Sequence, residues 1–147
     1  MVASVGRMYR HIGHTWRRIW SDPRLRRRYS SLRASWRRGR TVQRIVKPSR
    51  LDKARMLGYK AKKGFVVVRV KVSRGGLRKI PPKLGRRQKR MGISKIKRGK
   101  SMGKIAEERA LRKHPNLDLL GSYYVGEDGS VKWFEVVMKD PILGPSL

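Results

Sequence analysis

The stretch Phe65-Val-Val-Val-Arg-Val-Lys-Val-Ser73 carries the clearest structural signal of the chain. Valine occupies every even position from Val66 to Val72, while Arg69 and Lys71 fall on odd positions. Because successive side chains of a strand point to opposite faces, this alternation predicts a β-strand with one buried face and one charged face. We therefore expect Arg69 and Lys71 to be exposed and available to a partner.

A strand and a short helix are expected before this strand. Residues 41–47 are rich in β-branched side chains and predict the strand. Ser49 and Asp52, three positions apart, resemble a capping box that opens a short helix ending at Gly58.

The C-terminal part predicts a helix followed by a hairpin. The helix is expected over residues 104–114, with a Glu108–Arg112 ion pair at i, i+4. Aromatic and β-branched runs at 119–125 and 131–138 flank a turn-forming stretch, which indicates two paired strands. The mixture of helices and hairpin-connected strands predicts an α+β fold.

Two amphipathic helical segments are expected in residues 1–40, which we interpret as a basic N-terminal arm. Asp22 and Pro23 suit the N-cap and first turn of the second segment, and Gly39 suits its end. We interpret the apolar stripes of both segments as core rather than as a platform for base stacking. Their members are Ile12, Trp16 and Ile19 or Trp20 in the first segment, and Leu25, Tyr29, Leu32 and Trp36 in the second.

The arginine-rich composition of this arm is open to three interpretations. A mitochondrial transit peptide and a helix lying on a membrane surface would both share it. A helical arm that packs on protein and presents its arginines to phosphate is the third. We favour the third because the basic bias continues to residue 104, beyond any cleavable leader.

The charge of the chain is large and unevenly distributed. The 147 residues include 40 Lys or Arg and nine Asp or Glu, for a net charge of +31. Residues 1–106 hold 35 basic and two acidic residues, whereas residues 107–147 hold five basic and seven acidic residues. This excess favours nucleic acid or an anionic membrane surface as the partner. The chain has no cysteine, which excludes disulfides and cysteine zinc sites, and its longest apolar run of four residues cannot span a membrane.

The basic excess is densest in residues 74–104, which contain 13 Lys or Arg, six Gly and no acidic residue. Such a segment is either a disordered linker or an insertion that becomes ordered against a polyanion, and we favour the second. We expect it, and much of 1–40, to be disordered in the free chain. The predicted core is thus formed by residues 41–73 and 105–141, with a C-terminal tail at 142–147.

Residues for catalysis are scarce. His11 and His14 have no nearby third metal ligand, and the adjacent Glu107 and Glu108 would diverge on a helix. Gly75-Gly76 is not followed by the signature of a nucleotide-binding loop. We therefore expect no enzymatic activity, no cofactor and no metal.

Several long strings resemble one family of large-subunit ribosomal proteins, the archaeal and eukaryotic family fifteen-e. They are residues 50–76, Ala106-Glu-Glu-Arg-Ala110, His114-Pro-Asn-Leu117 and residues 122–136, in the order of the family. The resemblance implies a structural constituent of the large ribosomal subunit, located in the cytoplasm. It also implies binding to large-subunit rRNA and to neighbouring ribosomal proteins, with neither a membrane nor a small-molecule substrate as partner. The implied fold is a small α/β/α sandwich with a four-stranded, mainly antiparallel sheet.

RNA contacts are expected from basic residues of the arm, of the core around the central strand, and of the insertion, because Arg and Lys bind phosphate. These residues are Arg17, Arg18, Arg24, Arg26, Arg27, Arg28, Arg37, Arg38, Arg40, Lys60, Lys62, Lys63, Arg69, Lys71, Arg74, Arg78, Lys79, Lys83, Arg86, Arg87, Lys89, Arg90, Lys95, Lys97, Arg98 and Lys100.

Two other classes of protein remain as alternatives. A small basic DNA-binding chromatin or nucleoid protein would share the charge. An imported organellar enzyme would need an acidic or nucleophilic constellation that the sequence lacks.

Overall fold

The computed structural model describes residues 2–77, 79–93 and 98–143 of the chain. Its elements are α1 (Val2–Arg18), α2 (Pro23–Arg38), β1 (Val42–Ile45), α3 (Leu51–Met56), β2 (Phe65–Ser73), the 3₁₀ turn η1 (Gln88–Arg90), α4 (Met102–Lys113), β3 (Asp118–Glu127) and β4 (Val131–Lys139). The α+β class and the predicted order of elements are confirmed.

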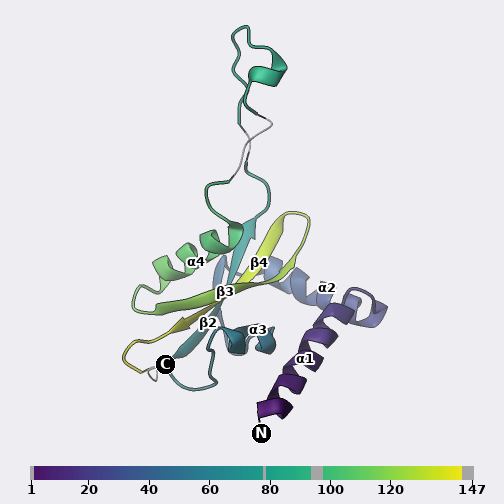
Figure 1. Ribbon diagram of the computed structural model, residues 1–147, viewed down its shortest axis with the longest axis vertical. Coiled ribbons are helices and arrows are strands. Elements are labelled where there is room, and N and C mark those ends of the chain that lie inside the picture. The colour runs from purple at the N-terminus through teal and green to yellow at the C-terminus, as the bar shows by residue number, and fades with distance from the viewer. Residues whose placement is uncertain (1, 78, 94–97, 144–147) are drawn as a thin grey trace.

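The four strands form one antiparallel sheet in the order β1-β2-β4-β3. β2 pairs along its whole length with β4, so that Phe65 lies opposite Lys139 and Ser73 opposite Val131. β3 and β4 form the predicted hairpin. Figure 1 shows α4 on one side of the sheet and α3 with the two N-terminal helices on the other.

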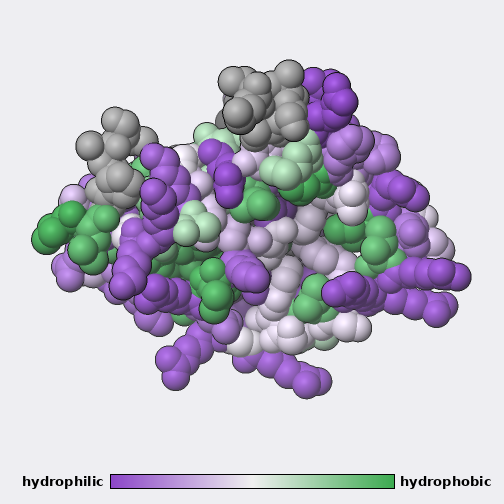
Figure 2. Space-filling model, turned by 90° about the horizontal axis from the view of Figure 1, so that it is seen from below, coloured by the Kyte–Doolittle hydropathy of each residue, from purple (hydrophilic) through white to green (hydrophobic). Residues whose placement is uncertain are grey.

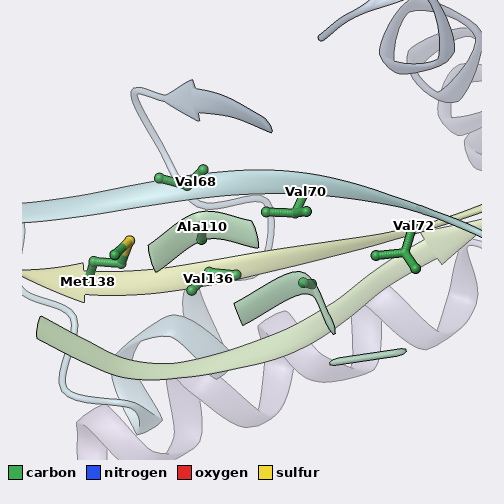
Figure 3. Packing of buried hydrophobic residues seen from close by; sticks show 7 residues of the cluster. Val68, Val70, Val72, Ala110, Val136 and Met138 are labelled. Atoms are coloured by element: carbon green, nitrogen blue, oxygen red, sulfur yellow. The ribbon is translucent and has the colours of Figure 1, made fainter. Parts of the chain in front are cut away.

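The even valines of β2 pack against α4, as the alternation predicts. Val68, Val70 and Val72 form one buried cluster with residues of β4 and with Ala106 and Ala110 (Figure 3). The two alanines are four residues apart and therefore lie on the same face of α4. Their small side chains let the helix approach the sheet closely.

The opposite face of β2 is also covered, so the prediction of an exposed charged face is wrong. The side chain of Arg69 is only 13% exposed, and its guanidinium lies 3.9 Å from the centre of the Trp36 ring. The Lys71 ammonium donates to the carbonyls of Arg37 and Gly39 at 3.1 and 2.9 Å. Both cations are covered because α2 crosses this face, which the alternation within β2 cannot reveal.

Arg69 is held there by Glu135, which is fully buried. The Glu135 carboxylate accepts hydrogen bonds from Arg69 at 3.0 Å, from the Tyr123 hydroxyl at 2.6 Å, and from the backbone N–H and hydroxyl of Ser49 at 2.9 and 2.6 Å. Burial, together with the neighbouring Glu135 charge, raises the pKa of Tyr123 far above its ordinary value. The predicted capping box is wrong, because Ser49 binds Glu135 and α3 begins after Arg50 without a side-chain cap.

α2 is attached to the sheet through the aromatic stripe. Tyr29 is buried edge-to-face against Trp16 and Trp36, and its hydroxyl donates to the carbonyl of Val125 at 2.6 Å. Asp22 caps the helix by accepting from the backbone N–H groups of the first turn, as predicted. The interpretation of the stripes as core is confirmed for Trp16, Tyr29 and Trp36, and it is wrong for Trp20 and Leu32, which are 48% and 44% exposed. In this structure α2 is docked on the sheet and not disordered.

The same helix protects an edge of the sheet. β3 has a strand partner on one side only, and the carbonyls of Val125 and Glu127 accept hydrogen bonds from α2. Tyr29 donates to the first of these carbonyls and Arg33 to the second, the latter at 2.6 Å. The N-terminal arm is therefore part of the folded body.

We predict that Val68→Asp unfolds the core, because it places an unpaired carboxylate at a fully buried position. The cost is roughly several kcal/mol, comparable with the ~5–15 kcal/mol total stability of a small domain. Val46→Asp is the matched control, since Val46 is 92% exposed. Urea unfolding followed by circular dichroism should show a large loss for the first variant and a change within about 0.5 kcal/mol for the second. Equal stability of the two variants would contradict this assignment of the core.

We also predict that Arg69→Met lowers the free energy of unfolding by about 3 kcal/mol, because the buried Glu135 charge loses its cationic partner. The double variant Arg69→Met/Glu135→Met should recover much of this loss, since no charge is then left unpaired. Thermal and urea unfolding of both variants measure the difference. Full stability of Arg69→Met alone would show that the ion pair is dispensable.

Candidate nucleic-acid interface

The few acidic residues are mostly engaged within the protein. The ion pairs between described residues are Arg37–Asp128, Arg50–Asp52, Arg69–Glu135, Arg74–Glu127, Lys100–Glu108 and Lys132–Glu127. The predicted Glu108–Arg112 pair is wrong, because Glu108 binds Lys100 at 2.7 Å instead. The hydrogen bond from Lys100 holds the pKa of Glu108 below its ordinary value.

Part of the predicted RNA-binding set is consequently used inside the protein. Arg37, Arg69 and Lys71 hold the arm on the sheet, and Arg74 donates to the backbone of the β3–β4 turn at 2.9 Å. Arg98 donates to the carbonyl of Gly75, and Lys100 pairs with Glu108. Arg17 donates along its own helix to the carbonyl of Gly13.

A larger part of the set is exposed, and its side chains have no hydrogen-bond or ion-pair partner among the described residues. Its members are Arg18, Arg24, Arg26, Arg27, Arg28, Arg38, Arg40, Lys60, Lys62, Lys63, Lys79, Lys83, Arg86, Arg87, Lys89 and Arg90. We call them the unpaired cations. Arg78, Lys95 and Lys97 lie outside the described residues.

The first group of unpaired cations lies on α2, where Arg24, Arg26, Arg27, Arg28 and Arg38 are exposed. Arg24 lies three residues before Arg27 and four before Arg28, so their like charges are neighbours on the helix surface. Such pairs destabilise a helix when no anion lies between them. Phosphates bound between these arginines would remove the repulsion.

A second group lies on the insertion, which leaves the body as a long excursion with η1 near its far end (Figure 1). Gly75 and Gly76 turn the chain away from the end of β2 with φ angles of +77° and +76°, a region that favours glycine. Almost every described residue of the excursion is exposed. Its cations are therefore presented well beyond the surface of the body.

A third group of basic residues borders a groove of about 880 Å³, at the end of the sheet where β4 ends. The predicted residues Lys62 and Lys63 line it, and the fold adds Arg44, Lys47 and Lys113. The last three are missing from the predicted set, because they come from separate segments and only the tertiary structure brings them together. No local sequence pattern marks them.

These three basic groups can bind phosphate but offer little for catalysis. No group of three or more His, Asp or Glu side chains within residues 2–77, 79–93 and 98–143 could hold a metal ion. In that same part of the chain, no helix has the length and apolar character needed to cross a bilayer.

One known protein family matches almost the whole chain. The chain matches the family model described as Ribosomal L15 over residues 7–144. It belongs to the ribosomal protein L15e family. The resemblance seen in the sequence is thereby confirmed, and the match gives no support to a DNA-binding chromatin protein or to an enzyme.

Membership of the L15e family implies a structural protein of the large ribosomal subunit, and with it a cytoplasmic location. It also implies association with rRNA and with other proteins of that subunit. The L15e match includes α2, the insertion and the whole sheet, so that all three basic groups lie within the family region.

The unpaired cations predict an unusual response of the free L15e chain to salt. Because the net charge is +31, screening should reduce internal repulsion more than it weakens the few surface ion pairs. We expect the melting temperature to rise by a few degrees between 50 and 500 mM NaCl. For a chain of this size, this rise corresponds to an increase of about 1 kcal/mol in the free energy of unfolding. Differential scanning calorimetry measures it. A melting temperature that falls with salt would mean that the ion pairs outweigh the repulsion.

Proposed function

We propose that the unpaired cations bind the phosphates of large-subunit rRNA and so fix the relative positions of its helices. The observation that supports this most strongly is the charge imbalance within the fold. The acidic residues are largely engaged by internal partners, whereas the unpaired cations have no hydrogen-bond or ion-pair partner among the described residues. In a protein of the L15e family, rRNA is the polyanion that supplies the missing charge.

The arm, 1–40, would act as a rigid basic surface in this role. Its aromatic residues Tyr29 and Trp36 are docked on the sheet, so the exposed arginines of α2 project from a fixed helix. Arginine suits this position because its planar guanidinium binds phosphate oxygens in pairs and stacks on exposed bases. A rigid array can thus position RNA as well as neutralise it.

The insertion, 74–104, would act differently, by entering spaces between RNA helices that the body is too wide to enter. Its glycines let the backbone approach RNA closely, and its cations follow one another along an extended chain. Exposed apolar side chains such as Ile80 and Leu84 would then contact bases or neighbouring proteins. We expect this segment to become ordered on the RNA, since it buries little of its own surface.

The proposal predicts a strongly salt-dependent affinity for large-subunit rRNA. With about 10 phosphate contacts, the slope of log K against log salt should be of order −7 to −9. Replacing Arg26, Arg27 and Arg28 together with Gln should make the slope shallower by about 2–3. Filter binding at several salt concentrations gives both values.

The matched control for this triple variant removes the same charge from the C-terminal core. Arg112, Lys132 and Lys139 lie outside the predicted contacts, and their replacement by Gln should leave the slope nearly unchanged. A slope near zero for the original chain would overturn the proposal. Equal changes in the two triple variants would show that net charge alone, and not the α2 surface, governs binding.

A further inference from the structure

The groove at the end of the sheet is built by four separate segments. They are the residues of β1 and its exit, the loop that enters β2, the turn after α4, and the residues after β4. A smaller hollow of about 330 Å³ adjoins it and shares Val46, Tyr59 and Phe65 with it. Figure 2 views this end of the molecule and shows hydrophobic patches interspersed with projecting hydrophilic side chains.

The rim of the groove is strongly cationic. Arg44, Lys47, Lys62 and Lys63 are exposed, and Lys113 donates to the Val42 carbonyl at 3.3 Å without an acidic partner among the described residues. One acid, Asp140, lines the groove, and its carboxylate accepts from the backbone N–H groups of Ile142 and Leu143. His114 also lines the groove. The occupant that suits this rim is an anion.

The walls of the groove are apolar. Tyr59 and Phe65 are half-buried and pack edge-to-face, with ring centroids 6.2 Å apart. Val46 is 92% exposed, and Leu143 is largely exposed as well. A free phosphate would satisfy the rim and leave these side chains in water. An occupant that also carries a flat apolar surface would cover both.

We propose that this groove binds an unpaired nucleotide of RNA, with its base against Val46, Tyr59 and Phe65 and its phosphates on the Lys62–Lys63 side of the rim. An unstacked base with its flanking phosphates supplies an apolar face and negative charge in one unit. A paired nucleotide cannot enter, because its base is stacked and hydrogen-bonded within the duplex. The inference rests on the proposed function and specifies which form of RNA this site selects.

The test compares two RNA hairpins that differ only in one bulged nucleotide. The original chain should bind the bulged hairpin more tightly in fluorescence anisotropy titrations. Val46→Asp places a carboxylate in the groove and should reduce this preference by about tenfold, the scale of one base-stacking contact. Leu84→Asp is the matched control, because Leu84 is 89% exposed on the insertion and the change in charge is the same. It should weaken both hairpins alike and keep the preference.

The outcomes separate this inference from the proposed function. If Val46→Asp keeps the preference for the bulge, the groove does not select a nucleotide, although binding to RNA stands. If the original chain binds neither hairpin, the proposed function itself fails. An acidic decapeptide forms a further arm of the experiment. Peptide binding that Val46→Asp weakens, with an unchanged preference for the bulge, would assign the groove to a protein partner and overturn the inference.

Discussion

The carboxylate of Glu135 is fully buried, and its need for partners organises one whole side of the sheet. A buried charge is tolerated only when it is paired and hydrogen-bonded. Glu135 meets this requirement with Ser49 before α3, Arg69 on β2 and Tyr123 on β3. Arg69 in turn provides the flat cation on which Trp36 of α2 lies. This carboxylate therefore holds in place the cation that Trp36 contacts, and the bonds of Tyr29, Arg33 and Lys71 complete the docking of the arm.

This constraint separates the charges of the protein into two sets with different roles. The Arg69–Glu135 ion pair joins β2 to β4 beneath Trp36 of the arm, and the Arg37–Asp128 ion pair fixes the arm to the β3–β4 turn. The cations that remain lie on α2, on the insertion and around the groove, and the acidic residues are too few to neutralise them. A protein of this composition carries a large repulsive free energy when alone, and phosphate relieves it. Placement in the large ribosomal subunit is consistent with that requirement.

The sequence predicts the elements well where a local pattern determines them. The valine alternation of β2, the Asp22–Pro23 start of α2 and the β3–β4 hairpin depend on neighbouring residues alone, and all three are confirmed. The sequence-based prediction fails for Arg69. The alternation shows that the two faces of β2 differ in polarity, but it does not show that α2 of the arm covers the charged face. The groove could not be predicted either, since its cations come from segments that meet only in the folded chain.

We infer that the unpaired cations contact RNA, whereas the internally bonded cations do not. The most direct test is an acetylation footprint of lysines, read by mass spectrometry on the free chain and on purified large subunits. Lys79, Lys83 and Lys89 are exposed on the insertion and should react readily in the free chain and become protected in the subunit. Lys71 donates to two backbone carbonyls and should react slowly in both states. Equal reactivity of the three insertion lysines in the free chain and in the subunit would contradict the account.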